Sequence, residues 1–144
     1  MADNYKILAQ FLPANNSAEH VVYTVPSAAA STIASTTSSP FTVQVAPKAV
    51  SAQTHTIISS IIICNLHSGA VTYDIRLKEA AAGSGGGGTF PDNDKEMLFY
   101  TTSIPAAKTH VLSLGLGLSA GNLIKVKISV ASKLAFTIMG IEVT

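Results

Sequence analysis

The chain has 144 residues, the length of one compact domain, and 47% of them are hydrophobic while only 12% are charged, against roughly 25% charged residues in typical soluble domains. The net charge is +1 and no run of Lys or Arg occurs, which excludes the electrostatic footprint of nucleic-acid or membrane-surface binding. No run of about 18 apolar residues is present, which excludes a membrane-spanning helix. Because so few residues are charged, neutral side chains must cover much of the surface, as suits a protein packed against neighbours.

The first half of the chain contains short strand candidates separated by polar segments. They are NYKILAQ (4–10), HVVYTVP (20–26), FTVQV (41–45) and THTIISSIIICNL (54–66). Residues 1–19 are expected to form an N-terminal arm or first strand, without the pattern of a secretory signal. Residues 27–54 are expected to form a Ser/Thr/Ala-rich insertion, because Ser and Thr compete for backbone hydrogen bonds and the segment has no apolar stripe for a helix.

Alternating apolar and polar residues dominate the second half. In VTYDIRLKE (71–79) the core set is Val71, Tyr73, Ile75 and Leu77, and the solvent set is Thr72, Asp74, Arg76 and Lys78. Further strands are expected in KEMLFYTTS (95–103), HVLSLGLGL (110–118), LIKVKISV (123–130) and LAFTIMGIEV (134–143). About nine short strands with no credible helix predict an all-β fold, an antiparallel β-sandwich or jelly-roll-like single domain spanning 1–144.

Two details of these strands bear on surfaces. In HVLSLGLGL the leucines share one face, while Ser113, Gly115 and Gly117 share the other, where small side chains allow another chain to approach closely. Cys64 is the single cysteine, so an intramolecular disulfide is excluded. Its place in the apolar run SSIIICNL predicts a small buried hydrophobic side chain.

The stretch GSGGGGTF (83–90) contains Gly83, Gly85 and Gly88 at the spacing of a dinucleotide-binding fingerprint. That fingerprint requires a following helix, whose free amide groups hold the pyrophosphate. Here Pro91 and then a strand follow, and no Lys-Ser or Lys-Thr pair completes a P-loop. We therefore interpret residues 80–94 as a flexible Gly-rich loop at the tip of a hairpin.

The stretch GLSAG (117–121) matches the nucleophile elbow of hydrolases, with Ser119 as the nucleophile. That serine must lie between a strand and a helix, whereas Ser119 is expected between two strands, in a hairpin turn at SAGN (119–122). Asp74 and His110 lie on other strand patterns and do not complete a triad. We predict no catalytic residue and no enzymatic activity.

Possible metal ligands are scattered. The histidines, His20, His55, His67 and His110, lie near strand ends, where ordinary edge or loop roles, a metal contact or a pH-sensitive subunit contact are all open. Asp92 and Asp94 in PDND suit a turn better than a calcium loop, because no matching ligand pattern follows. We predict no metal and no cofactor.

Three segments resemble a family of small structural proteins from tailed phages, many of which infect cyanobacteria and marine bacteria. They are VYTVPSA (22–28), SSIIICNLHSGAVTYDIRL (59–77) and residues 98–143, and together they cover about half of the chain. The shared features are a Tyr-Thr-Val-Pro start, a hydrophobic strand ending in Cys-Asn, an alternating strand, a segment ending in Leu-Pro, a leucine-alternating strand, a Gly-Asp or Gly-Asn turn and a final strand with a Gly and an acidic residue. Here these are Tyr23 to Pro26, Cys64, Asn65, Pro105, Leu114 to Leu118, Gly121, Gly140 and Glu142.

The resemblance implies a virion component with a β-sandwich, in the first place a capsid decoration or cement protein. We expect it to form a homotrimer and to clamp adjacent major capsid proteins. The resemblance also implies a protein made in the host cytoplasm and located on the capsid surface. The family usually has a short turn where this chain carries residues 27–54. We therefore expect partner contacts at Ile33, Phe41, Val43 and Val45 of the insertion and at Tyr5 and Phe11 of the N-terminal arm.

Two alternatives stay open. In the first alternative, the protein belongs to the tail, neck, baseplate or fibre of the virion. In the second, it is a carbohydrate-binding sandwich that recognises a host surface. The second alternative requires exposed aromatic rings on which sugars stack, and the chain has no Trp and few aromatic residues outside expected core faces.

Overall fold

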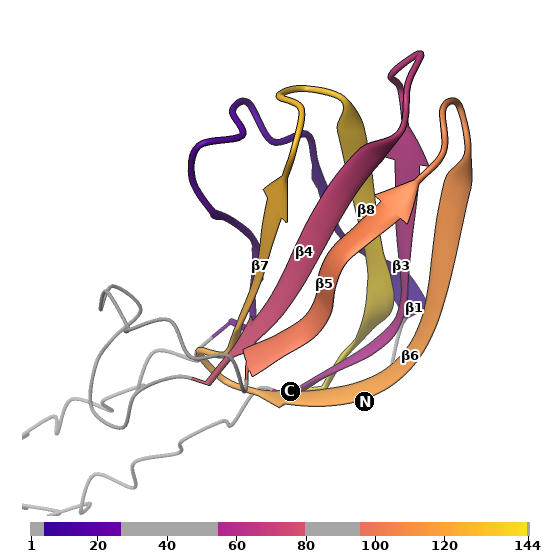
Figure 1. The fold of residues 1–144 in the computed structure, drawn as a ribbon. Helices are drawn as coiled ribbons and strands as arrows, with labels where there is room; N and C mark the ends of the chain where they lie inside the picture. The colour runs from indigo at the N-terminus through magenta and orange to yellow at the C-terminus, as the bar shows by residue number, and fades with distance from the viewer. Residues whose placement is uncertain (1–4, 27–54, 80–95, 144) are drawn as a thin grey trace, which may run out of the picture.

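A computed structural model describes residues 5–26, 55–79 and 96–143. Two four-stranded sheets pack face to face (Figure 1). Sheet A has the order β1-β8-β3-β6 and sheet B the order β2-β7-β4-β5. The strands are β1 (Tyr5–Phe11), β2 (His20–Thr24), β3 (His55–Asn65), β4 (Val71–Lys78), β5 (Met97–Ile104), β6 (Thr109–Ser119), β7 (Leu123–Ile128) and β8 (Leu134–Val143).

The strand pairing is that of a jelly roll. All neighbouring strands are antiparallel, and the pairs β1–β8, β2–β7, β3–β6 and β4–β5 form one long hairpin that is rolled into two sheets. The pairs β3–β8 and β4–β7 complete the sheets. The prediction of an all-β, antiparallel sandwich is confirmed, and β4 and β5 are hairpin partners as expected. The expected strand at 41–45 and the loop at 80–94 lie outside the described residues.

The core lies between the sheets and follows the alternation of the sequence. Val71, Tyr73 and Ile75 of β4 are buried, and the Tyr73 ring meets Phe136 of sheet A edge to face, with ring centroids 6.4 Å apart. Leu112, Leu114 and Leu116 pack against this core from β6. Complete burial of an aliphatic or aromatic side chain of this size stabilises the fold by roughly 1.5–3 kcal/mol.

Asn65 explains one of the sequence features singled out above. It is buried at the end of β3, where its side-chain amide donates hydrogen bonds to the carbonyls of Gly69, Ile104 and Pro105 at 3.0, 3.1 and 3.0 Å. Its Oδ1 accepts a hydrogen bond from the His67 backbone at 2.8 Å. One side chain therefore joins the β3–β4 turn to the β5–β6 turn, because the buried carbonyls of both turns need a donor.

Two expected exposures are wrong. Lys78 was placed on the solvent face of its strand, but it is buried at the end of β4, and its ammonium lies 3.8 Å from the Glu96 carboxylate, which offsets the cost of burial. Cys64 was expected to be buried, but it is only partly buried. It lies on the outer face of sheet A because its neighbours Ile63 and Asn65 both point inward.

Two local predictions need correction. A turn does follow Ser119, with Gly121 at φ 82° and the Asn122 N–H bonded to the Ser119 carbonyl at 3.0 Å. It is not a hairpin turn, because β6 belongs to sheet A and β7 to sheet B. The expectation of a free arm is wrong for residues 5–11, where the alternative expectation of a first strand is confirmed: they form β1, which pairs with β8 along most of its length.

The two ends of the sandwich differ. At one end, at the top of Figure 1, lie the short connections 12–19, 66–70, 105–108 and 129–133. At the opposite end the described chain stops after Pro26 and Glu79 and resumes at His55 and Glu96. Thus the described residues that flank 27–54 and 80–95 all lie at the same end of the sandwich.

Candidate interaction surfaces

The outer face of sheet A is built from rows of neutral side chains. The strand register places Tyr5, Ile141, Ile57 and Gly117 in one row across all four strands. A second row consists of Gln10, Thr137, Ile62 and Val111. Several large apolar side chains are open to solvent here: Val111 is 62% exposed, Tyr5 54%, Ile7 53% and Ile57 46%.

No Asp, Glu, Lys or Arg lies on this outer face among the described residues. The charged side chains in sheet A are Lys6 and Glu142, and both lie on the inward side of the pleat, opposite the buried Gly140 and Thr56. They form an ion pair with each other at the end of the sandwich away from the short loops. We call the neutral surface the sheet A face.

The edge strand β6 gives this face its smallest side chains. Ser113, Gly115 and Gly117 point outward as predicted, and a Cβ added to either glycine would meet no atom within 4 Å. The space above them is therefore open within the described chain. Backbone at these positions is accessible to another chain at close range.

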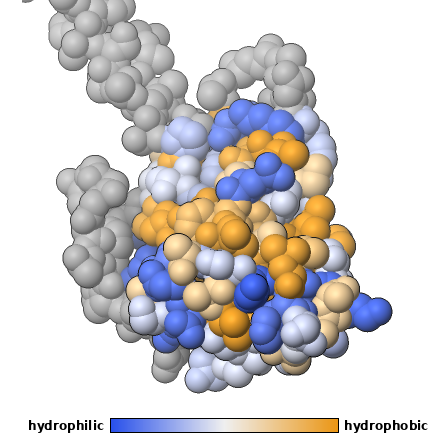
Figure 2. Space-filling model, turned by 90° about the horizontal axis from the view of Figure 1, so that it is seen from above, coloured by the Kyte–Doolittle hydropathy of each residue, from blue (hydrophilic) through white to orange (hydrophobic). Residues whose placement is uncertain are grey.

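The neutral surface continues onto the short-loop end. A groove of about 290 Å³ lies between the ends of β1 and β8 and is lined mainly by Phe11, Leu12, Leu66 and Ala135. Leu12 is 47% exposed and Leu66 57%. Figure 2, which looks onto this end, shows hydrophobic surface in a band across the middle of the molecule.

The outer face of sheet B carries charge instead. Glu19 lies between two cations on neighbouring strands: its carboxylate is 2.7 Å from Arg76 Nε of β4 and 3.3 Å from Lys125 Nζ of β7. These side chains are partly buried by one another, so the pairs are better shielded from solvent than isolated surface pairs. We call this surface the sheet B face.

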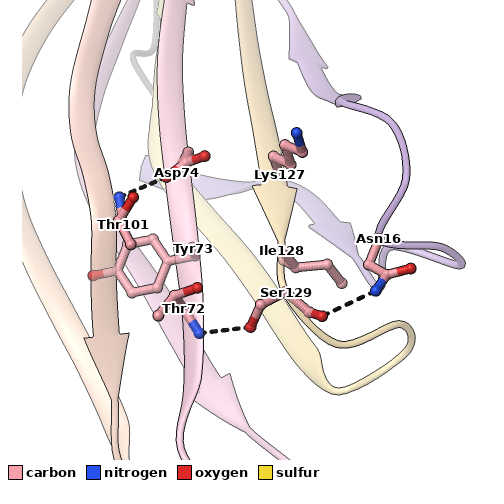
Figure 3. A pocket seen from close by; sticks show the side chains of 8 residues that line it. All are labelled: Asn16, Thr72, Tyr73, Asp74, Thr101, Lys127, Ile128 and Ser129. Atoms are coloured by element: carbon pink, nitrogen blue, oxygen red, sulfur yellow. Dashed lines mark hydrogen bonds between the residues drawn. The ribbon is translucent and has the colours of Figure 1, made fainter.

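A polar hollow of about 180 Å³ lies beside this ion-pair cluster. Figure 3 shows Asp74 and Thr101 on one side of it and Lys127 on the other, with Thr72, Ser129 and Asn16 along the lower rim. Two hydrogen bonds hold the rim, from the Thr72 N–H to Ser129 Oγ at 2.9 Å and from the Asn16 amide to the Ser129 carbonyl at 3.0 Å. This constellation was missed at the level of sequence, because Asp74 and Lys127 are far apart along the chain and belong to different strands.

The residues expected to contact partners are only partly within the described chain. Tyr5 lies on the sheet A face and its hydroxyl bonds Ser59 Oγ at 2.7 Å. Phe11 packs against the core and lies 5.7 Å from the His20 ring, measured between centroids, so it is less available than an arm residue would be. Ile33, Phe41, Val43 and Val45 lie outside the described residues, as do Gly83 to Gly88, Asp92 and Asp94.

The candidate chemical groups are not brought together. His20 and His67 bond local partners, the Asn15 carbonyl and the Gly69 N–H, and His110 bonds the Tyr73 hydroxyl of the other sheet. Within residues 5–26, 55–79 and 96–143, no three His, Cys, Asp or Glu side chains are grouped so that they could hold a metal ion. No helix in the described part of the chain is long and apolar enough to cross a membrane.

Comparison with protein-family models, with curated proteins and with solved structures finds no match for this chain. A jelly roll serves many unrelated functions, so the fold alone does not assign one. The functional argument therefore rests on the surfaces described above.

Proposed function

We propose that this protein is a non-enzymatic structural component of a phage virion, a capsid decoration or cement protein that forms a homotrimer and clamps adjacent major capsid proteins. The observation that carries the proposal is the sheet A face, a four-stranded surface without a charged side chain among the described residues. The sequence resemblance to phage structural proteins supplies the biological setting.

The physical argument begins with the cost of removing water. Burying an unpaired ionised group is expensive, whereas apolar area gains roughly 25 cal/mol per Å² when it leaves water. Tyr5, Ile7, Ile57 and Val111 offer such area, and the serines and glycines of β6 let a partner come close. The sheet A face is thus the cheaper of the two outer faces to bury, and we assign it to the major capsid protein.

The size of the face explains why several copies should act together. Four strands spaced about 4.8 Å apart and about 25 Å long cover roughly 500 Å², less than the roughly 800 Å² per partner of a standard stable interface. One copy would therefore bind weakly. A trimer on the lattice raises the effective concentration of the second and third contacts, and the bound trimer stabilises the assembled shell by mass action.

The test is the number and position of copies in virus particles purified from the source of this sequence. Quantitative mass spectrometry of the particles, with antibody labelling in electron micrographs, gives both. Hundreds of copies spread over the capsid are expected. A handful of copies at one vertex would instead assign the protein to the tail, neck, baseplate or fibre, and complete absence from particles would overturn the virion role.

A further inference from the structure

The polar hollow on the sheet B face leaves two opposite charges facing one opening. Asp74 and Lys127 are cross-strand partners in the β4–β7 register, and such partners stand close enough to interact. They form no ion pair, because Asp74 Oδ1 accepts a 2.6 Å hydrogen bond from the Thr101 N–H on the other side. The Lys127 ammonium makes no hydrogen bond or ion pair with any described residue.

The backbone beside Asp74 is strained. Thr101 has φ 46°, a conformation that is a genuine outlier for a β-branched residue. The other described non-glycine residues with positive φ, Ala107 and Ser132, lie in turns, whereas Thr101 lies within strand β5. Such strain costs of order 1–3 kcal/mol and persists where surrounding contacts enforce it.

The strain has a structural result. The β4–β5 register shifts between Tyr73 and Ile75, so that Tyr100 and Thr101 together oppose Asp74 alone. This bulge brings Thr101 to the hollow and leaves the preceding residue, Tyr100, 75% exposed. The hollow is therefore surrounded by a carboxylate, an ammonium, an amide and hydroxyl groups.

We propose that this hollow binds one neutral sugar residue of a glycan. A sugar hydroxyl both donates and accepts, so adjacent hydroxyls can donate to Asp74 and accept from Lys127, which a simple anion or cation cannot do. The volume of about 180 Å³ suits a single ring, since pockets for drug-sized ligands measure roughly 300–1,000 Å³.

The position of the hollow makes it compatible with assembly. It lies on the sheet B face, on the opposite side of the sandwich from the sheet A face. A copy held through sheet A would therefore keep the hollow open to solvent. The sugar site itself does not depend on the virion role and can be tested on the isolated chain.

The experiment is an NMR titration of the full-length, isotopically labelled chain with glucose, galactose, mannose and N-acetylglucosamine at millimolar concentrations. At least one sugar is expected to give saturable shifts of the Thr72, Thr101 and Ser129 amides. Lys127→Ala and Asp74→Asn are expected to weaken that binding at least about tenfold, since each removes a charge-assisted hydrogen bond. Lys108→Ala, which removes an exposed lysine in the β5–β6 turn, is the matched control and should bind like the unmodified chain.

Other outcomes overturn the proposal. The proposal would be overturned if none of the four sugars gave a saturable shift, or if the shifts mapped away from the hollow. Unchanged binding by a folded Lys127→Ala chain would also overturn it. Shifts at the hollow with sodium acetate or glycine, but with no sugar, would assign it to a small charged ligand instead.

Discussion

The two outer faces of this sandwich are built by the same alternation of residues but carry opposite kinds of surface. On sheet A the outward positions of β1, β3, β6 and β8 hold no Asp, Glu, Lys or Arg, whereas on sheet B the same kind of position holds Asp74, Arg76, Lys125 and Lys127. The inward positions of both sheets are mostly apolar, with polar exceptions such as Thr56, Asn65 and Lys78. Folding constrains the outward positions less than the inward ones, so the difference between the outer faces supports the proposal that they have different surroundings.

The two faces also differ in how the strands approach one another. In sheet A, a shift in register at Ile58–Ser60 lets β3 pass very close to β8, with glycine at the point of contact. In sheet B, the shift in register beside Asp74 opens the edge and places a strained Thr101 at a hollow. The register shift in β3 thus brings two strands of sheet A closer together, whereas the one between β4 and β5 accompanies a hollow on sheet B.

The largest expected effect comes from breaking sheet A at its closest approach. A Cβ added at Gly140 would collide with the carbonyl oxygen of Ile57, which is backbone and cannot swing away. Overpacking of this kind costs typically 1–3 kcal/mol, so Gly140→Ala is expected to lower the free energy of unfolding by about 3 kcal/mol. Chemical denaturation followed by circular dichroism measures the change.

Gly115→Ala is the matched control for that substitution. It adds the same methyl group to sheet A, but on the outer face, where nothing lies within 4 Å. Its stability is expected to equal or slightly exceed that of the unmodified chain, because alanine has less freedom to lose on folding. Equal destabilisation by the two substitutions would mean that the close β3–β8 approach has been misplaced.

The next largest effect is expected from placing a charge on the sheet A face and comparing it with the same charge on the sheet B face. Val111 on the sheet A face is 62% exposed and Val21 on the sheet B face is 44% exposed, so a glutamate at either position leaves the core intact. Val111→Glu is expected to weaken attachment to capsids about 100-fold, because the carboxylate would be buried unpaired. Val21→Glu, whose cross-strand partner is Lys125, should attach normally.

Cosedimentation with particles stripped of the protein measures this difference, and both variants should unfold within about 0.5 kcal/mol of the unmodified chain. Loss of attachment by Val21→Glu with retention by Val111→Glu would exchange the roles of the two faces. Equal attachment by both variants would show that neither Val111 nor Val21 lies in the interface with the capsid.

Much of the fold could be predicted from sequence, because alternation records which side of a strand is buried. Val71, Tyr73 and Ile75 point inward as the pattern requires, and the small residues of β6 point outward. Lys78 was misplaced because its burial depends on Glu96, across the β4–β5 connection. Cys64 was misplaced because an apolar run such as SSIIICNL gives no phase to its strand, so inward and outward residues look alike.

The surfaces were harder to predict, because each is assembled from distant strands. Composition correctly pointed to a weakly charged exterior, but it could not say that the charge gathers on sheet B. Asp74 and Lys127 become neighbours only through the β4–β7 register. The bulge that sets Thr101 beside Asp74 has no glycine or proline to announce it in the sequence.

The smallest expected effect concerns one of the hydrogen-bonded links between the two sheets. Tyr23 of sheet B reaches sheet A, where its hydroxyl bonds Thr56 at 3.0 Å and the Glu142 carboxylate at 2.9 Å, and burial raises the pKa of Tyr23 to about 12. Because the folded pKa exceeds the ordinary value of 10.0, the contribution of Tyr23 to stability is complete below pH 10 and is lost as the pH rises toward 12.

Tyr23→Phe should lower the free energy of unfolding by about 1 kcal/mol at pH 7. It should also flatten the decline of stability at alkaline pH, which denaturation at a series of pH values measures. Tyr100→Phe, which removes an exposed hydroxyl, is the control. An alkaline decline as steep in Tyr23→Phe as in the unmodified chain would show that the ionisation of a buried Tyr23 does not cause the decline.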